Sequence, residues 1–277
     1  MNKLLVICGP TASGKTALAV HLAKLFNGEI ISADSRQVYI GMDIGTGKDT
    51  SELSGVPIWM IDVVRPDEEF SVSHYTREAN AVMADIRKRG KIPLVVGGTG
   101  LYIKSLTQGF GTIDIPPNKR LRKKLNTATV SELQGMLTPS VLDQMNQSDR
   151  NNPRRLIRKI EIALSDTTKS GPVVEEQDLL CIGLMVSMEV LYRKIDERVE
   201  KRVAAGVKDE IQTLLQQGYS WNMPSMNTLG YKEWKHASSD DDAITRWKFD
   251  EHAYARRQMT WIRKMHAVFW FDVEKNG

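Results

Sequence analysis

The chain has 277 residues, of which 41% are hydrophobic and 26% are charged, and its formal net charge is +4. This composition is that of an ordinary globular protein, and it excludes a disordered, a collagen-like or a coiled-coil chain. The longest apolar stretch near the N-terminus, residues 4–8, is too short for a membrane-spanning helix or a signal-peptide core. We therefore expect a soluble cytoplasmic protein in which Cys8 and Cys181 are free structural thiols.

Six short apolar runs bounded by turn residues have the length of β-strands. They are residues 3–8, 29–33, 57–62, 92–96, 179–186 and 268–272. The first, fourth and fifth runs are almost wholly apolar, which is typical of strands covered on both faces. Helical periodicity lies between the early runs, at residues 15–26 and 73–89. Strands that alternate with helices predict an α/β fold, a doubly wound parallel sheet like that of the P-loop NTPases.

Residues 116–177 interrupt this alternation, so they predict a mainly helical insertion in a core formed by residues 1–115 and 178–277. Within the insertion, residues 153–164 carry apolar side chains on one helical face and basic side chains on others. The whole excess of positive charge lies in the insertion, because basic and acidic residues are equal in number elsewhere. The insertion is therefore either a solvated helical lobe or a surface for a polyanion. After the fifth run, residues 188–265 predict two or three long helices.

The segment after the first predicted strand has the spacing of a phosphate-binding loop. Its residues are Gly9, Pro10, Thr11, Ala12, Ser13, Gly14, Lys15 and Thr16. Glycines let backbone N–H groups converge on phosphate oxygens, the lysine reaches the outer phosphates, and the threonine hydroxyl is a ligand for Mg²⁺. This loop predicts a phosphorylated ligand without specifying which one.

Two further segments follow the second and fourth predicted strands and so lie at the same edge of the sheet. The first is Asp34-Ser35-Arg36-Gln37, whose carboxylate is a helix cap, a Mg²⁺ ligand or a general base. The second is residues 97–102, GGTGLY, in which Thr99 presents a hydroxyl among glycines. The alternative for the second segment is a plain turn between a strand and a helix.

The three segments GPTASGKT, IISADSRQVYIGMDIGTGK and VVGGTGLY occur in this order, and together they closely resemble the bacterial tRNA dimethylallyltransferases. The resemblance continues through residues 152–158, 229–233 and 254–261 and covers nearly the whole chain. It implies transfer of the dimethylallyl group of dimethylallyl diphosphate to N6 of the adenosine at tRNA position 37, next to the anticodon, with release of diphosphate. The implied partner is the tRNA anticodon stem-loop, and nothing in the sequence requires more than a monomer.

The resemblance also implies roles for single residues. The phosphate loop, residues 9–16, would hold the diphosphate, with Mg²⁺ bound through it at Thr16 and with Lys15 stabilising the leaving group. Thr99 would lie near the bridging oxygen, Asp34 would be the catalytic base, and Arg198 would clamp a phosphate. The implied contacts with tRNA are Asp34, Ser35, Arg36, Gln37, Thr99, Arg122, Arg154, Arg155, Arg158, Gly230, Tyr231, Arg256, Arg257 and Gln258.

Some of these assignments have alternatives. Arg120 fits almost as well as Arg122, and Trp234 and Tyr254 either stack on RNA bases or pack in the core. The chain also departs from the family at Ile58-Trp59, where a histidine-bearing stretch is usual, and at His252, where an arginine is common. Three other functions compete with the implied one: an adenylate isopentenyltransferase, a nucleotide kinase, and an RNA-binding protein without activity.

Overall fold

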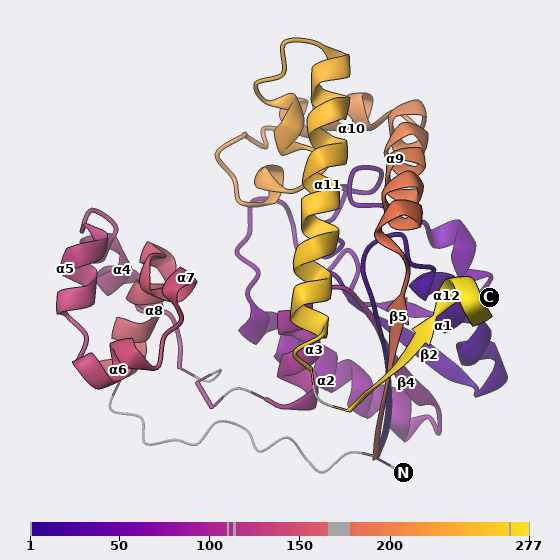
Figure 1. Cartoon of the computed structure of the whole chain (residues 1–277), viewed down its shortest axis with the longest axis horizontal. Helices are drawn as coiled ribbons and strands as arrows, with labels where there is room; N and C mark the ends of the chain where they lie inside the picture. Colours follow the sequence, from indigo (N-terminus) through magenta and orange to yellow (C-terminus); the bar gives the residue numbers. More distant parts are fainter. Residues whose placement is uncertain (1, 110, 113–114, 166–177, 266, 277) are drawn as a thin grey trace. The chain divides into compact units, whose positions relative to one another are not determined.

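The structure is a computed structural model that describes residues 2–109, 111–112, 115–165, 178–265 and 267–276 (Figure 1). Its internal contacts divide the chain into two compact units. The core unit comprises residues 1–108 and 174–277, and the insert unit comprises residues 109–173. Within the described residues, no helix is long and apolar enough to cross a membrane.

The core unit is built on a parallel sheet with the order β3-β2-β4-β1-β5-β6 (Figure 1). Its strands are β1 (Lys3–Cys8), β2 (Gly28–Ala33), β3 (Ile58–Trp59), β4 (Ile92–Gly97), β5 (Asp178–Met185) and β6 (Val268–Asp272). All six predicted strands occur, and the predicted α/β class is confirmed. The third strand is shorter than predicted because Met60 and Asp62 have positive φ angles of 64° and 53°, which an extended strand does not allow.

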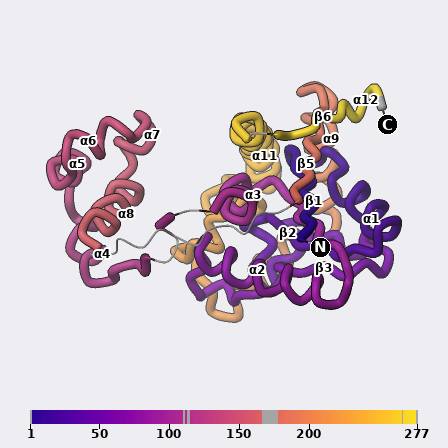
Figure 2. The backbone as a smooth tube through the Cα atoms, turned by 90° about the horizontal axis from the view of Figure 1, so that it is seen from below, coloured from indigo at the N-terminus to yellow at the C-terminus, as the bar shows by residue number. Residues whose placement is uncertain are grey.

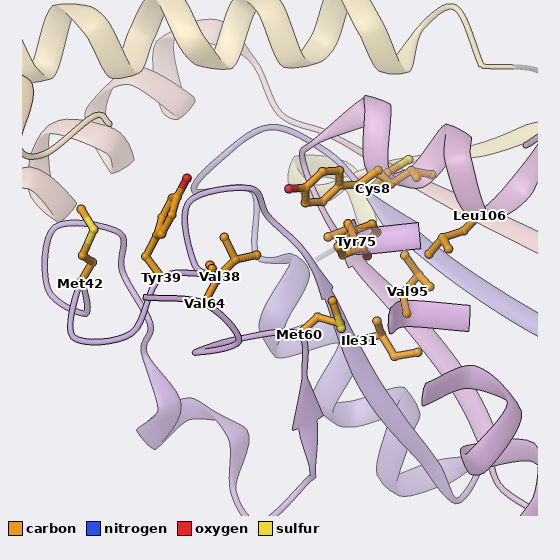
Figure 3. Close-up of a cluster of buried hydrophobic side chains, with 14 of the residues drawn as sticks. Cys8, Ile31, Val38, Tyr39, Met42, Met60, Val64, Tyr75, Val95 and Leu106 are labelled. Atoms are coloured by element: carbon orange, nitrogen blue, oxygen red, sulfur yellow. The ribbon is translucent and has the colours of Figure 1, made fainter. Parts of the chain in front are cut away.

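Helices cover both faces of the sheet. They are α1 (Lys15–Leu25), α2 (Val72–Lys88), α3 (Gly100–Thr107), α9 (Met188–Ala204), α10 (Val207–Gln216), α11 (Asp240–Ile262) and α12 (Val273–Asn276), with 3₁₀ turns η1 (Thr50–Leu53), η2 (Ser225–Asn227) and η3 (Lys232–Trp234). Because side chains alternate along a strand, Leu5 and Ile7 of β1 pack in one cluster with α1, and Val6 and Cys8 pack in another with α2 and α3. The second cluster extends from the sheet to Met42 and Val64 in the segments after β2 and β3 (Figure 3).

The fifth strand is less buried than its apolar sequence predicts. Leu179 and Leu180 are 39% and 45% exposed, because β6 pairs with β5 only from Cys181 onward. Cys181 itself is buried, and its Sγ atom lies 3.9 Å from that of Cys8 on the neighbouring strand. Both thiols are free, as predicted.

The insert unit consists of five helices in its described residues (Figures 1 and 2). They are α4 (Lys119–Leu125), α5 (Val130–Gly135), α6 (Pro139–Asp143), α7 (Gln147–Arg150) and α8 (Pro153–Ala163). Side chains of Asn118, Thr129, Asn146 and Asn152 cap four of them by accepting a backbone N–H bond, which compensates for the unpaired amides of such short helices. The unit has its own hydrophobic core, formed by Leu125, Leu133, Leu137, Met145, Leu156, Ile157 and Ile160.

A buried carboxylate joins β2 to β3 and to the end of α2. Glu29 is 1% exposed and accepts hydrogen bonds from Trp59 Nε1 at 2.8 Å, Arg89 Nη2 at 2.7 Å and Lys91 Nζ at 2.7 Å. The hydrogen bonds from Arg89 are the main cause that lowers the pKa of Glu29 to about 2, against the opposing effect of burial. Trp59, one of the two residues that replace the usual histidine-bearing stretch, is therefore part of a structural ion-pair cluster.

We expect Glu29→Gln to destabilise the protein at pH 7 by roughly 2 kcal/mol, a figure reduced for the partial exposure of Arg89 and Lys91. A carboxylate whose pKa is lowered in the folded protein stabilises the fold at pH values above its pKa in the unfolded chain. This contribution disappears as the pH falls from about 5 toward 2. Thermal unfolding between pH 7 and pH 3 should therefore depend less on pH in the variant. Glu69→Gln, on an exposed carboxylate, is the matched control, and an equal effect of both changes would contradict the role of Glu29.

Candidate active site

A cavity of about 730 Å³ lies at the carboxyl ends of β1, β2 and β4. One side is formed by the phosphate loop, a second by the segment after β2, and a third by basic side chains of α9. The predicted site residues that line the cavity are Thr11, Ala12, Ser13, Gly14, Lys15, Thr16, Asp34, Arg36, Gln37, Arg198 and Gln258. Three segments far apart in the sequence therefore meet at one edge of the sheet.

The phosphate loop is a tight turn between β1 and α1. Ala12 and Gly14 have positive φ angles of 61° and 87°, and Gly14 is the N-cap of α1. A Cβ atom on Gly9 would lie 2.9 Å from Ser13 Oγ, so the loop requires glycine there. Ser13 Oγ is buried and has no hydrogen-bond partner among the described residues. The loop thus offers a buried hydroxyl and the first amides of a helix, which together suit an anion.

Lys15 and Arg198 place two positive charges beside the loop. Lys15 Nζ donates to the carbonyl of Pro10 at 2.6 Å, and Arg198 donates to Thr11 Oγ1. Burial, and next the charge of Arg198, lower the pKa of Lys15 to about 8. Burial also lowers the pKa of Arg198. Both shifts reflect cations held close together out of water, an arrangement that a bound anion would stabilise.

Asp34, Ser35 and Thr99 lie together next to the loop. Asp34 Oδ1 accepts the backbone N–H of Arg36 at 2.9 Å, and its side chain is 18% exposed. Thr99 Oγ1 accepts the backbone N–H of Ser35 at 3.0 Å. The bond between Ser35 and Thr99 joins the segments that follow β2 and β4. The bond from Arg36 uses one oxygen of Asp34 and leaves its other oxygen, Oδ2, for a ligand at the wall of the cavity.

A buried ion-pair network lies behind Asp34. Arg36 Nη1 donates to Glu251 Oε1 at 2.9 Å, and the Arg36 guanidinium lies 4.6 Å from the centre of the Tyr254 ring. Arg202 Nη1 lies 3.7 Å from the same carboxylate oxygen. Although burial opposes ionisation, the three surrounding arginines lower the pKa of Glu251 to about 2. Sequence reasoning missed Glu251 as a partner of Arg36 and missed Arg202 altogether.

Two glutamines predicted to contact tRNA have their polar groups engaged inside the protein. Gln37 Nε2 donates to the carbonyl of Gly47 at 2.9 Å, and Gln37 Oε1 accepts from Ser32 Oγ at 3.0 Å. Gln258 is 4% exposed, and its Oε1 accepts the backbone N–H of Thr11 at 2.8 Å. Gln258 therefore supports the phosphate loop instead of lying on an RNA-facing surface.

Tyr231, one of the implied contacts with tRNA, lies inside the core unit in this structure. Tyr231 is 0% exposed, and its hydroxyl donates to Glu210 Oε1 at 2.6 Å. Gly230 is also a packing residue, because a Cβ atom there would lie 2.6 Å from the carbonyl oxygen of Gly45. Trp234 is partly buried against the hydrophobic cluster that contains Tyr231. It therefore packs in the core, which was one of its two predicted roles.

The segment between β2 and η1 is held in place by a carboxylate from α10. Glu210 accepts three consecutive backbone N–H groups, those of Asp43 at 2.8 Å, Ile44 at 2.7 Å and Gly45 at 3.1 Å. Residues 43, 44 and 46–50 line the cavity. The position of this wall therefore depends on Glu210, which no sequence motif indicated.

On α11, Arg256 and Arg257 are exposed, as residues that contact a large partner must be. Arg256 Nη1 donates to the hydroxyl of Tyr192 at 2.6 Å. His252 stacks on the same Tyr192 ring with a centroid distance of 4.1 Å, and its Nε2 lies 2.8 Å from Asp196 Oδ1. His252 is thus engaged with α9.

In the insert unit, the basic residues differ in their surroundings. Arg122 and Arg158 both bind the buried carboxylate of Glu161, at 2.7 Å and 3.2 Å. Arg158 also donates to the carbonyls of residues 112 and 115, so it holds the unit together. Arg155 pairs with Asp149, whereas Arg154 is exposed. The basic side chains of α8 are therefore partly neutralised by carboxylates within the insert unit.

Two family models match the chain. The model described as IPP transferase matches residues 37–265, and the one described as Isopentenyl transferase matches residues 2–67. Among curated proteins, the chain is 43% identical to the tRNA dimethylallyltransferase of Roseiflexus castenholzii, over 97% of this chain and 92% of that protein. It is 39% identical to the enzyme of the same name from Thermomicrobium roseum, over 100% of this chain and 89% of that protein.

Solved structures agree with these matches. The chain resembles the tRNA isopentenylpyrophosphate transferase of Bacillus halodurans with a TM-score of 0.74 and 38% identity, covering 98% of this chain and 90% of that one. It resembles a eukaryotic dimethylallyltransferase, described as acting on tRNA, with a TM-score of 0.82 and 27% identity, covering 98% and 74% of the two chains. By the breadth and identity of these matches, the chain belongs to the IPP transferase family.

Proposed function

We propose that this protein transfers the dimethylallyl group of dimethylallyl diphosphate to N6 of the adenosine at tRNA position 37. The observation that carries the proposal is the meeting of a phosphate loop with Asp34 at one cavity, next to Thr99, which accepts the backbone N–H of Ser35. The relatives named as tRNA dimethylallyltransferases support the choice of donor and acceptor. A nucleotide kinase would need the loop but would leave the arrangement of Asp34, Ser35 and Thr99 without a role.

The diphosphate would be bound by the amides of the phosphate loop, the buried Ser13 hydroxyl, Lys15 and Arg198. These groups stabilise the negative charge that develops on the diphosphate as the bond between the prenyl carbon and oxygen breaks. Thr99 lies beside Asp34 through its bond to Ser35, where its hydroxyl would interact with the bridging oxygen.

Asp34 would act on the adenine amine. The lone pair of an exocyclic amine is delocalised into the ring, so the amine is a poor nucleophile. A carboxylate that accepts one of its N–H bonds orients it and takes the proton as the new bond between nitrogen and carbon forms. The products are the prenylated adenosine, diphosphate and the protonated carboxyl of Asp34. To reach the cavity, the adenosine must leave the base stack.

The residues present fit a magnesium ion. Thr16 supplies a hydroxyl oxygen at the cavity, and magnesium prefers oxygen ligands shared between protein and phosphate. The described residues hold no cluster of three or more His, Cys, Asp or Glu side chains suited to a metal, so Thr16 would bind the ion together with the diphosphate. When bound, magnesium neutralises charge on the leaving group.

The test is incubation of the purified protein with dimethylallyl diphosphate and Mg²⁺ and either unmodified tRNA or AMP, followed by mass spectrometry of the nucleosides. We expect a dimethylallyl mass gain on adenosine from tRNA alone. Gain on AMP with equal efficiency would replace the proposed acceptor by a mononucleotide, the acceptor of adenylate isopentenyltransferases. Absence of gain on both would contradict the proposal.

The pH dependence should report the ionisation of Lys15. With a pKa of about 8, Lys15 carries its charge below pH 8 and loses it above, so kcat/KM for dimethylallyl diphosphate should be level at pH 7 and fall above pH 8. Lys15→Arg keeps a cation that does not titrate in this range. A fall above pH 8 that is equally steep in the Arg variant would assign the dependence to another group.

Arg154 should contribute to tRNA affinity without contributing to stability. It is exposed on α8, so Arg154→Ala should weaken tRNA binding and reduce the slope of log Kd against log salt by roughly 0.7 to 0.9. Arg158→Ala should instead lower the stability of the insert unit, because Arg158 holds Glu161 and two carbonyls. Lys24→Ala, at an exposed position of α1, is the control for the loss of one positive charge elsewhere on the protein. An unchanged salt slope in the Arg154 variant would make α8 a solvated face.

A further inference from the structure

Arg202 is a buried cation of the cavity for which neither the sequence motifs nor the proposed mechanism has a role. It lies one helical turn after Arg198 on α9, and both arginines line the cavity. Arg202 is 6% exposed. A buried arginine normally has its donors bonded, because an unbonded buried charge is costly.

The protein satisfies Arg202 poorly. A guanidinium has five N–H donors, but the contacts of Arg202 are a bond of 3.4 Å to the carbonyl of Gly45 and an ion pair of 3.7 Å with Glu251. Its Nε is buried with no hydrogen-bond partner among the described residues. Most N–H donors of Arg202 thus have no partner in the described part of the protein, and Arg202 lines the cavity.

The guanidinium packs directly against the backbone of Gly47. A Cβ atom on Gly47 would lie 1.7 Å from Arg202 Nη2, and the φ angle of 70° at this position also favours glycine. Gly47 is itself held, because its carbonyl accepts from Gln37 Nε2 and its N–H donates to the carbonyl of Asp43. Arg202 therefore lies against a defined wall of the cavity.

The charges of the cluster also favour an anion. Lys15, Arg36, Arg198 and Arg202 are positive, and the carboxylates that act on them are Asp34, Glu251 and Asp49. Asp49 is exposed. Burial, and next the charge of Arg198, lower the pKa of Arg202 to about 9. The four cations of this cluster thus outnumber its three carboxylates, of which one is exposed to water, and a ligand that supplies negative charge would stabilise the excess.

We propose that Arg202 binds the diphosphate of the prenyl donor as a second arginine of α9 beside Arg198. This inference rests on the proposed function for the identity of the donor. The planar guanidinium is suited to phosphate because it donates two parallel N–H bonds. Glu251 contacts both Arg202 and Arg36. This one carboxylate would therefore orient Arg202 toward the phosphates and hold Arg36 beside Asp34.

The experiment compares the wild type with Arg202→Met, in which Glu251 keeps its hydrogen bond from Arg36. Binding of inorganic diphosphate with Mg²⁺ is measured by calorimetry, and KM for dimethylallyl diphosphate and kcat are measured with tRNA. We expect Kd and KM to be roughly 10- to 100-fold higher in Arg202→Met than in the wild type. The affinity for tRNA should not change between them.

Arg193→Met is the matched control, because Arg193 is exposed on the same helix and does not line the cavity; its diphosphate affinity should equal that of the wild type. Thermal unfolding confirms that each variant is folded. If Arg202→Met does not fold, Arg202→Lys keeps the charge but loses the two parallel N–H bonds, and a several-fold higher Kd is then expected.

Equal diphosphate affinity in folded proteins with and without Arg202 would overturn the inference and leave Arg202 as a packing residue. If the wild type prenylates tRNA, equal affinity contradicts only the role of Arg202 and leaves the proposed function unaffected. If the wild type does not prenylate tRNA but diphosphate binding still depends on Arg202, the proposed function fails and the anion site remains.

Discussion

Replacement of Asp34 by asparagine is expected to lower kcat for tRNA prenylation by roughly 100-fold or more. The amide has the size of the carboxylate and retains an oxygen that can accept the N–H of Arg36, a bond of 2.9 Å in the native protein. It cannot take up a proton from the adenine amine. Single-turnover kinetics with saturating tRNA and donor measure the chemical step directly, and KM for dimethylallyl diphosphate should change little.

Asp49→Asn is the matched control for this change. Asp49 also lines the cavity but is exposed, so loss of its charge alters the field in the cavity without removing the proposed base. We expect a nearly normal single-turnover rate in this control. An unchanged rate in the Asp34 variant would show that another group, or bulk solvent, accepts the proton.

Replacement of Glu210 by alanine should have the second large effect, through the wall of the cavity. The change leaves three consecutive backbone N–H groups and the buried hydroxyl of Tyr231 without their acceptor. A buried donor that loses its partner costs about 1 to 3 kcal/mol of folding free energy. The N–H groups of residues 43–45 can bond to water instead, which recovers part of this free energy. We expect a lower Tm and a fall in kcat/KM of more than 10-fold, because residues 43, 44 and 46–50 line the cavity.

Asp209→Ala is the control for Glu210, since it removes the neighbouring, exposed carboxylate at the start of the same helix. Both changes remove one negative charge from the first turn of α10, so both lose the favourable interaction with the helix dipole. A fall in kcat/KM that occurs with Glu210 and not with Asp209 assigns the effect to the three N–H bonds. Equal falls in kcat/KM for the two variants would show that the effect comes from the lost negative charge at the start of α10.

The fold and the phosphate loop could be predicted from sequence because their signals are local. Apolar runs marked the strands, and the spacing from Gly9 to Thr16 marked the loop. The third strand was overestimated because its apolar residues continue past the point where Met60 turns the backbone. An apolar pattern records which side chains are buried, and it does not record where the φ angle changes sign.

The support of the site could not be predicted because it depends on contacts between distant segments. Glu251, Arg202 and Glu210 each lie in a helix with many charged residues, and periodicity does not tell which charge is buried in an ion pair. Tyr231 and Gln258 looked like surface residues next to basic motifs, but long-range contacts with Glu210 and Thr11 bury them. Charged and polar residues in the core can be assigned only when their partners are known.

The position of β1 in the sheet has a consequence for folding during synthesis. β1 pairs with β4 on one side and with β5 on the other, and the whole insert unit is translated between these two strands. Until β5 leaves the ribosome, one edge of β1 has unpaired backbone groups next to apolar side chains. The insert unit has its own core and can fold in that interval, and a folded unit between β4 and β5 adds little to the entropy cost of pairing them. One edge of β1 therefore stays unpaired until residue 178 emerges, and a translational pause before that point would prolong its exposure.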